Sequence, residues 1–467
     1  MDTFHKKIEY INPEENFERY CVNESENVIV DAFSKKTAVH AGLMDRFAPK
    51  EQTQEVLKNV LNQEGNNRTA AYIHVPFCET HCLYCGFYNQ PYRKEQSKIY
   101  TDTLIKEIKL WENTTAFKTK PINALYFGGG TPTALEVEDI SRLLTYIRNT
   151  FPLANDCEIT MEGRISNMTR DKVEAYLQGG VNRFSLGVQS FNTDLRRSMG
   201  RRSDRDTIIE RINMIKEYNQ AAVVLDLIYG FPNQTMDIWE DDIKLAQSLE
   251  IDGFDCYQLN VFPNTPLGKR IADGSMNPAL NVKEKTELFI KSVELMQKAL
   301  YTRISVNHWQ RTTRERNIYN RLARGYASCL SFGAGAGGNI NGYSYMILRD
   351  YQGYLAAVKN GVKPIMGISI PGENYSMYKE ISEYFETGYL DLAYLENKYN
   401  LPLTDICSRL LSQWENAGVI KYENNKIILT LAGQFWFVNL SQLLQEYIKL
   451  TLQFNSSNNL TGERVSL

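Results

Sequence analysis

The sequence has no overall basic excess, no long apolar run and few cysteines. Its 52 Lys and Arg residues stand against 55 Asp and Glu, a formal net charge of -3, and this balance gives no general footprint for nucleic acid. Residues 1–20 mix charges and lack the apolar core of a signal peptide, and no later run approaches the length of a membrane helix. The sequence therefore predicts a cytoplasmic protein with a small ligand and without nucleic-acid or membrane partners.

Cysteine is too sparse for a disulfide scaffold, with eight residues in a chain of 467. Three of the eight, Cys78, Cys82 and Cys85, nevertheless fall within one short segment, whereas the other five are scattered. Scattered cysteines are typical of core positions or idle thiols. The cluster of three indicates a metal site.

Between residues 71 and 262 one pattern repeats: a short β-rich apolar run, a polar or glycine-bearing turn, then an amphipathic helical stretch. Neighbouring parallel strands need crossover helices, so six such units in a row predict an α/β fold whose parallel sheet curls into a partial (β/α)6 barrel. The six runs are 71–77, 123–129, 157–163, 182–189, 223–230 and 254–262.

The barrel is predicted to occupy residues 66–340, with a different organisation on either side. Residues 1–65 are polar and acidic, end in a turn-prone run, and are interpreted as an N-terminal extension. Residues 341–455 contain a helix, a turn, a second helix and a hairpin around Asn424, which is typical of a small winged-helix-like α+β module. The polar tail, 456–467, is predicted to be disordered.

The three clustered cysteines have the spacing C-x3-C-x2-C and directly follow the first predicted strand. Three thiolates can bind three irons of a [4Fe-4S] cubane, which leaves the fourth iron open to a chelating group such as the amino and carboxylate groups of S-adenosylmethionine (SAM). The alternative is a structural zinc site that borrows His74 or His81. That alternative is disfavoured because structural zinc usually pairs two C-x2-C knuckles, and the sequence has no second one.

Polar residues and glycines stand where the predicted strands end. The second strand ends in the run GGGTPT, 128–133, where absent side chains would let a ligand approach the backbone closely. Reactive residues of β/α barrels gather at the carboxyl ends of the strands, so we expect these ends to meet at the rim beside the cysteines. The polar residues at the other strand ends are Glu162, Gln189, Asp226 and Asn260.

The cysteine motif, in the form YIHVPFCETHCLYCGFYN, resembles the signature of the radical SAM superfamily. Over residues 70–345 the sequence resembles, more narrowly, the oxygen-independent coproporphyrinogen III oxidase branch. The resemblance implies a [4Fe-4S] cluster on Cys78, Cys82 and Cys85 and two SAM molecules bound side by side. It identifies no catalytic residue.

The same resemblance assigns residues to each SAM molecule. Arg201 could bond to a methionine carboxylate through two N–H groups, although its place in the run SMGRR also suits a solvated helix charge. The residues implied for the first SAM, which sits on the cluster, are Tyr72, Tyr84, Gly129, Glu162 and Asn260. Those implied for the second SAM are Gly130, Thr131, Gln189, Arg201, Asp226 and Gly337.

Further motifs resemble those of the ChuW/HutW anaerobic heme-utilisation group, in the order MEGR, SVNHWQ, ERNIYN, SFGAGAGG and PGENYSMYKEI along the chain. The resemblance implies a heme substrate: radical methyl transfer to the porphyrin opens the macrocycle, gives the linear tetrapyrrole anaerobilin and releases iron without oxygen. It also implies an electron donor of flavodoxin or ferredoxin type.

Two sister activities stay open as alternatives. A heme chaperone would use the cluster and SAM structurally, but the histidine of the chaperones' H-N-x-x-Y-W stretch is missing here, where the chain has Arg316. An oxygen-independent coproporphyrinogen III decarboxylase is disfavoured by the sequence of the glycine-rich region.

Histidine is scarce, with five in the chain, and a neutral imidazole is a common heme contact. His308 is the first candidate to contact heme, although a core histidine whose nitrogens are already bonded is an equal alternative. His40, in the N-terminal extension, is the second candidate.

Overall fold

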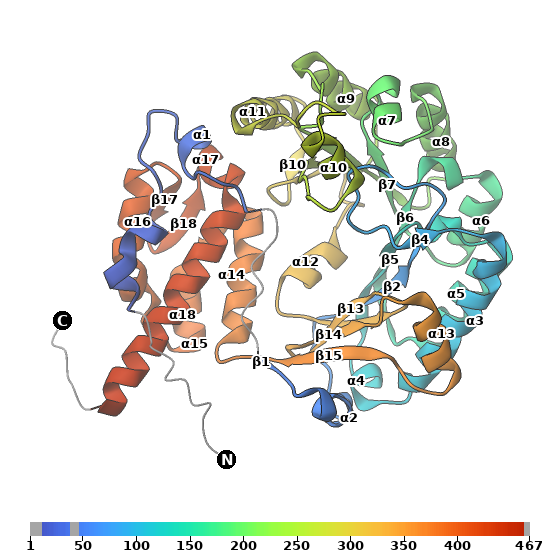
Figure 1. Cartoon of the computed structure of the whole chain (residues 1–467), viewed down its shortest axis with the longest axis horizontal. Coiled ribbons are helices and arrows are strands. Elements are labelled where there is room, and N and C mark those ends of the chain that lie inside the picture. The colour runs from blue at the N-terminus through green and yellow to red at the C-terminus, as the bar shows by residue number, and fades with distance from the viewer. Residues whose placement is uncertain (1–11, 38–45, 462–467) are drawn as a thin grey trace. The chain divides into compact units, whose positions relative to one another are not determined.

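The computed structural model describes residues 12–37 and 46–461, and the chain folds into two compact units (Figure 1). The larger unit holds the described residues of 44–376, and the smaller unit holds those of 1–43 and 377–467. Within the described ranges, no helix is both long and apolar enough to cross a membrane.

The larger unit is built on a 13-stranded sheet. Six of its strands are parallel neighbours, as the six repeated runs predicted, so the α/β class and the partial β/α barrel are confirmed. In sheet order they are β2 (Thr69–Val75), β5 (Ile122–Gly129), β6 (Leu153–Gly163), β7 (Arg183–Gln189), β8 (Ala222–Tyr229) and β9 (Gly253–Gln258).

The sheet continues beyond these six strands on both sides. Next to β2 lies a seventh parallel strand, β12 (Ser328–Phe332), followed by the antiparallel strands β13 (Gly337–Ile340), β14 (Tyr343–Ile347), β15 (Ile365–Ile370) and β1 (Arg46–Phe47). Next to β9 lie the antiparallel strands β11 (His308–Gln310) and β10 (Thr302–Arg303).

Helices cover the outer face of the parallel strands (Figure 1). Their N-termini carry the expected caps, because Asp204 and Thr235 accept backbone N–H groups at the first turns of α8 and α9, and Asn281 forms a capping box with Glu284 on α11. The long helices are α3 (Lys94–Trp111), α5 (Val137–Thr150), α6 (Arg170–Gln178), α8 (Arg205–Glu217), α9 (Met236–Ser248) and α11 (Val282–Lys298). The shorter ones are α2 (Thr53–Leu61), α4 (Thr115–Lys118), α7 (Thr193–Ser198), α10 (Pro266–Ala272), α12 (Ile318–Arg324) and α13 (Tyr351–Lys359).

The smaller unit has the order of elements of a winged helix. A helix, a strand, two helices and a β-hairpin follow one another, and the three strands pair in the order β16-β18-β17. Positive φ angles at Asn424 and Asn425 make the tight turn of the hairpin. The elements are α14 (Tyr375–Thr387), β16 (Tyr389–Asp391), α15 (Leu392–Tyr399), α16 (Leu403–Asn416), β17 (Ile420–Glu423), β18 (Lys426–Leu429), α17 (Leu431–Phe435) and α18 (Phe437–Thr461).

The boundaries between the units differ from those expected at 65 and 340. Strands β13 to β15 extend the large sheet to residue 370, because they continue its hydrogen-bond ladder beyond β12. The N-terminal extension divides between the units: α2 belongs to the larger, whereas Trp414 and Trp436 donate indole N–H groups to the carbonyls of Tyr20 and Ile29 within the smaller.

The disordered tail was expected from residue 456 onward. Helix α18 instead runs to Thr461, so the first six residues of that segment are helical. Residues 462–467 lie outside the described part of the chain.

Candidate active site

The cysteine loop begins at the end of a two-residue strand, β3 (Phe77–Cys78), which pairs with β4 (Gln90–Pro91). This pairing closes the loop, and the backbone N–H of Tyr92 donates to the carbonyl of Cys78 at 2.9 Å. Inside the loop, Leu83 donates its N–H to the carbonyl of Met199 at 3.1 Å, which ties the loop to the end of α7. Cys78 and Cys82 are each 2% exposed, so two of the three thiols face the interior.

Each of the three cysteine sulfurs accepts a hydrogen bond. Thr131 Oγ1 lies 3.4 Å from Cys78 Sγ, Arg164 Nη2 lies 3.2 Å from Cys82 Sγ, and the N–H of Phe87 lies 3.4 Å from Cys85 Sγ. Burial raises the pKa of the Cys78 thiol, and the bond from Thr131 opposes that shift. Donors aimed at sulfur favour the thiolate form that binds iron.

These three residues fit a [4Fe-4S] cluster better than a zinc ion. In the described part of the chain no three His, Cys, Asp or Glu side chains converge on one point, and a cubane takes only one thiolate per iron. His74 Nδ1 lies 3.1 Å from the hydroxyl of Tyr72, and the ring of His81 stacks on Tyr88 with centroids 4.0 Å apart. The cysteines would therefore hold a cluster that, when bound, chelates SAM and reduces it.

Arg164 was not singled out in the sequence, yet it contacts the cysteine loop directly. Besides Cys82 Sγ, its guanidinium donates to the hydroxyl of Thr80 and, at 2.9 Å, to the carbonyl of Thr80. The available signal was its position in MEGR, two residues after Glu162 and just past the end of β6.

One group of predicted residues meets around Gly128, at the carboxyl end of β5. A Cβ at Gly128 would lie 2.9 Å from Glu162 Oε2 and 3.0 Å from the ring of Tyr72. Gly129, with φ +109, donates its N–H to Glu162, and a Cβ added at Gly129 would lie 2.6 Å from the His74 ring. Side chains of this protein thus require glycine at Gly128 and Gly129, and the expected role of these glycines, room for a ligand at the backbone, stays a prediction.

A second group meets around Gly187 on β7. A Cβ there would lie 2.9 Å from Gln189 Nε2 and 3.1 Å from Arg201 Nη2, and Gly187 pairs with Asp226 across the ladder. Arg201 Nη1 donates to the carbonyl of Gly187 at 3.0 Å, and Arg201 Nε lies 3.2 Å from the hydroxyl of Tyr84. Arg201 is therefore a bonded residue of the rim, and the alternative of a solvated helix charge is wrong.

Gln189 combines two unusual features. Its φ is +68 at a bulge that ends β7, a left-handed backbone conformation that costs a residue other than glycine free energy. Its Oε1 is buried and has no hydrogen-bond partner among the described residues. A buried acceptor without a partner, on a strained backbone, makes Gln189 a candidate ligand contact.

Two carboxyl groups of the rim bind protons more tightly than usual. Burial and the nearby charge of Asp226 raise the pKa of Glu162 to about 8. Burial and Asp255 raise the pKa of Asp226 to about 7, and Ser185 donates to Asp226 Oδ1 at 3.4 Å. At neutral pH these groups exchange protons readily, so each can serve as donor or acceptor toward a bound ligand.

Five predicted residues remain to be placed, and one of them, Tyr84, belongs to the other group than expected. Tyr84 was expected at the first SAM, but it bonds to Arg201 of the second group. Thr131 bonds to Cys78, and Gly130 donates its N–H to the carbonyl of Val75 at 2.7 Å, so both lie against the cysteine loop. Gly337 begins β13, where its Cα faces the sulfur of Met346. Asn260 lies two residues beyond the end of β9.

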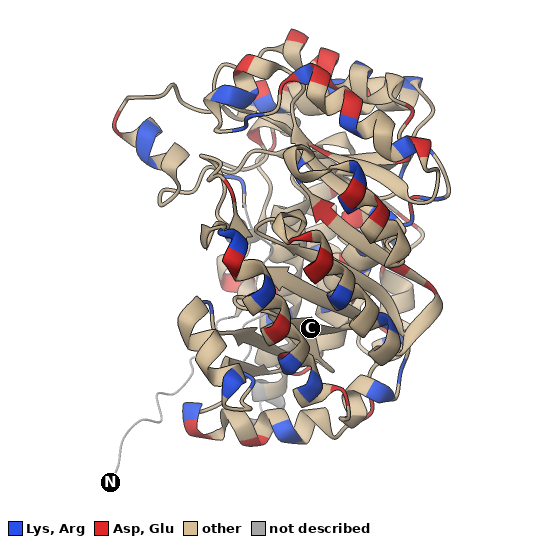
Figure 2. Cartoon of the chain, turned by 90° about the vertical axis from the view of Figure 1, so that its right-hand side faces the viewer, with Lys and Arg blue, Asp and Glu red and all other residues tan. Residues whose placement is uncertain are grey.

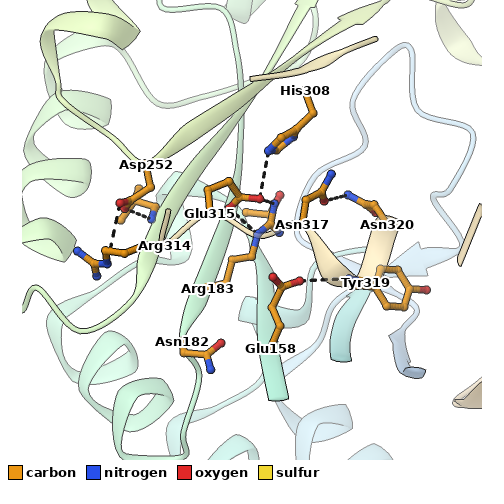
Figure 3. Close-up of polar contacts among 12 residues, drawn as sticks. Glu158, Asn182, Arg183, Asp252, His308, Arg314, Glu315, Asn317, Tyr319 and Asn320 are labelled. Carbon is orange, nitrogen blue, oxygen red and sulfur yellow. Dashed lines mark hydrogen bonds and ion pairs between the residues drawn. The ribbon is translucent and has the colours of Figure 1, made fainter. Parts of the chain in front are cut away.

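His308 is a core histidine, the alternative that the sequence left open. It is 0% exposed, and its ring lies between two carboxylates, with Asp255 Oδ2 2.8 Å from Nδ1. On the other side, Glu315 Oε1 lies 3.1 Å from Nε2, the contact that Figure 3 shows. Burial alone would lower the pKa of His308, but the two carboxylates raise it to about 9. Because His308 is fully buried and both ring nitrogens face carboxylates, it has no nitrogen available for heme iron, which contradicts the first candidate for heme contact. His40 lies outside the described residues.

The ion pairs of His308 continue into the barrel. Arg183 holds Glu315 through two bonds, with Nε 2.8 Å from Oε2 and Nη2 3.1 Å from Oε1 (Figure 3). From the same segment, ERNIYN, the ring of Tyr319 stacks on Tyr126 with centroids 4.5 Å apart. Glu315 and Tyr319 of this segment are therefore packed against the barrel, whereas Arg316, which replaces the chaperones' histidine, pairs with the exposed Asp156 at 3.2 Å.

The match to known proteins fits this geometry. A family model described as the radical SAM superfamily matches residues 72–246. The chain is 40% identical over 406 residues to an anaerobilin synthase of Escherichia coli O157:H7, an alignment that covers 86% of this chain and 89% of that protein. The chain belongs to the radical SAM superfamily and to its anaerobilin synthase family.

Other radical SAM relatives are more distant. An oxygen-independent coproporphyrinogen III oxidase of Escherichia coli K12 is 25% identical, over 81% of this chain and 85% of its own length. A heme chaperone, HemW, of Synechocystis is 28% identical, over 68% of this chain and 76% of its own. The solved coproporphyrinogen III oxidase HemN of Escherichia coli superposes with a TM-score of 0.78 at 20% identity, over 91% of this chain and 99% of that one. The last comparison shows that the radical SAM enzyme described here has the same fold.

Proposed function

We propose that this radical SAM enzyme degrades heme without oxygen, by radical methyl transfer to the porphyrin that opens the macrocycle to a linear tetrapyrrole and releases iron. The observation that carries the proposal is the rim itself, where three hydrogen-bonded cysteines lie beside two separate groups of polar side chains. The anaerobilin synthase, 40% identical to this chain, supports heme as the substrate.

The two groups are proposed to bind two SAM molecules. The group around Gly128, with Tyr72 and Glu162, would hold the SAM that chelates the cluster, and Gly129 and Asn260 would complete it. When bound and reduced, the cluster cleaves that SAM and supplies the 5′-deoxyadenosyl radical.

The group around Gly187 is proposed to hold the second SAM, the methyl donor. Arg201 offers guanidinium N–H groups to a carboxylate, and Gln189 Oε1 is an acceptor without a partner among the described residues. Asp226 faces the same point through its pairing with Gly187. These three residues would fix the methyl group relative to the first SAM, which is the orientation effect that radical transfer needs. Gly130, Thr131 and Gly337 are the other proposed contacts.

We also propose a heme contact, an electron donor and a cellular compartment. Heme is proposed to meet His40, since His308 is committed to its ion pairs. An electron donor of flavodoxin or ferredoxin type would reduce the cluster. All eight cysteines are free, which supports a reducing compartment, and we place the protein in the cytoplasm.

An anaerobic product analysis tests the proposal. Reconstituted enzyme with heme, SAM and a chemical reductant should give 5′-deoxyadenosine, S-adenosylhomocysteine and a methylated linear tetrapyrrole, while the heme absorbance disappears. Two SAM molecules predict that 5′-deoxyadenosine and S-adenosylhomocysteine both form, and SAM with a deuterated methyl group should transfer deuterium to 5′-deoxyadenosine. Heme that stays intact while SAM is cleaved would show that heme is not the substrate.

A second candidate is coproporphyrinogen III decarboxylation, which the likeness to the coproporphyrinogen III oxidases favours. Coproporphyrinogen III would then lose carbon dioxide from its propionates, a mass change that methylation does not produce. A heme chaperone would retain and transfer heme without either product.

A further inference from the structure

Four arginines line one small pocket beside the cysteine loop. The pocket has a volume of about 130 Å3 and is lined by Arg164, Arg196, Arg201 and Arg202, with Thr80 of the cysteine loop and Ser203 among its other walls. Arg196 is 3% exposed, whereas Arg202 is exposed and lies at the surface. The pocket therefore connects the protein surface with the cysteine loop.

The positive charge of this pocket is not balanced by carboxylates. In the ranges that the structure describes, none of the four arginines forms an ion pair, and Glu79, the acidic residue of the lining, accepts a hydrogen bond from Asn167 instead. Arg196 bonds to backbone carbonyls, those of Ser203 at 2.8 Å and Ser190 at 3.1 Å. Burial and the charge of Arg201 lower the pKa of Arg196 to about 10. In the loaded enzyme the Cys82 thiolate would face Arg164 and the proposed SAM carboxylate would face Arg201, so Arg196 and Arg202 supply the positive charge that is left for a further anion.

The rest of the molecule makes this concentration unusual. The chain as a whole has a formal net charge of -3, and basic and acidic residues are interspersed along the helices that face the viewer in Figure 2. Several arginines elsewhere on the surface have carboxylate partners, as Arg205 has in Asp241 at 2.6 Å. A local positive potential within a weakly acidic protein is suited to guide an acidic partner to one place.

The pocket is in contact with a cysteine that would bind the cluster. Arg164, in its lining, donates to Cys82 Sγ at 3.2 Å. The backbone that precedes Arg201 also packs on the loop, because a Cβ at Gly200 would lie 3.6 Å from the Cα of Cys82. One hydrogen bond thus separates the pocket lining from the Cys82 sulfur.

We propose that this four-arginine pocket is the docking surface for a small acidic one-electron carrier protein. Carboxylates on the carrier enter the pocket mouth at Arg202, and the carrier is thereby held next to the Cys82 edge of the cluster. One electron leaves the carrier and one reaches the cluster, with no bond made or broken. The inference rests on the proposed function only in requiring a reducible cluster.

The test measures reduction of the cluster itself, in the reconstituted full-length enzyme without heme. Stopped-flow absorbance would follow bleaching of the oxidised cluster by reduced flavodoxin, as the acidic carrier, and by reduced methyl viologen, a small cation. Arg202→Glu reverses the charge at the pocket mouth. Arg148→Glu is the matched control, since Arg148 is exposed near the end of α5 and bonds only to the carbonyl of Gln178, at the opposite end of the strands.

We expect Arg202→Glu to slow reduction by flavodoxin about tenfold at low salt, in keeping with the loss of electrostatic steering. Its rate with methyl viologen should not fall, and Arg148→Glu should match the wild type with both reductants. Added salt should slow the wild type more than Arg202→Glu.

Three results would overturn the inference. Equal rates with flavodoxin in wild type and Arg202→Glu would place docking elsewhere. Equal slowing by both reductants would indicate a disturbed cluster instead of a lost surface. Weaker SAM binding in Arg202→Glu with an unchanged flavodoxin rate would assign the pocket to a ligand carboxylate. Because heme is absent, none of these results depends on the substrate.

Discussion

The rim of the barrel and the polar network around His308 both contain buried polar and charged side chains. They differ in whether these side chains have partners. Around His308, each charged group has a partner of opposite charge: Asp255, Glu315 and Arg183 form a closed set of ion pairs. At the rim, the carboxyls of Glu162 and Asp226 form no ion pair with any residue that the structure describes, and Gln189 Oε1 has no hydrogen-bond partner among those residues. The contrast teaches that buried polarity alone does not identify a site.

The largest effect should come from the cysteine loop. Cys82→Ala should abolish the iron-sulfur absorbance and SAM cleavage, because a cubane with two protein thiolates loses a ligand whose burial and bond to Arg164 are already in place. Iron content and electron paramagnetic resonance of the reduced protein would measure this. Cys21→Ala, which removes a partly buried thiol of the smaller unit, is the control and should keep the full signal.

Breaking the ion-pair network around His308 should lower the free energy of unfolding and leave the residues of the rim in place. Arg183→Met leaves Glu315 buried opposite His308 alone, and removing one partner of a buried pair costs about 3–5 kcal/mol. Thermal unfolding would measure the loss. Arg205→Met breaks an exposed ion pair with Asp241 and should cost no more than about 1 kcal/mol. Similar losses in both variants would contradict the assigned role of the network.

At Gln189, binding and stability should move in opposite directions. Gln189→Asn suits the left-handed backbone better, so the melting temperature should stay equal or rise slightly, but the shorter side chain withdraws its acceptor from the site. Loss of one hydrogen bond to a charged ligand corresponds to about tenfold weaker binding of the second SAM. Equilibrium dialysis of SAM would give the stoichiometry. A stable variant that still binds two SAM molecules with unchanged affinity would show that Gln189 does not contact SAM.

The smallest effect should be on the pH dependence of stability. The pKa of Glu162 in the folded protein, about 8, exceeds its value of about 4.3 in an unfolded chain, so the folded state binds the proton more tightly. The stabilisation is complete at low pH and is lost as the pH rises from the unfolded to the folded pKa. Melting temperatures of the cofactor-free protein should therefore fall less between pH 5 and pH 8, values chosen to span about that window, in Glu162→Gln than in wild type. A parallel decline in both would contradict the shift.

The sequence was most informative where the signal is local. The six strands and the cysteine loop follow from patterns within a few residues, and the carboxyl ends of parallel strands necessarily meet, which placed Glu162, Gln189 and Asp226 on one rim. Partnerships between distant segments were not accessible. His308 reaches Asp255 only because β11 pairs with β9, and Arg164 reaches Cys82 across 82 residues. His308 was chosen because histidine is rare in this sequence, but the rarity of a residue type does not indicate whether the side chain is buried.

The smaller unit joins segments from both ends of the sequence, and this has a consequence for synthesis on the ribosome. The carbonyls of Tyr20 and Ile29 accept hydrogen bonds from Trp414 and Trp436, which lie 394 and 407 positions later in the chain. All strands of the large sheet are translated before α16. The barrel can therefore fold, and its cysteine loop can close, before the helices that pack on the segment containing Tyr20 and Ile29 have been synthesised.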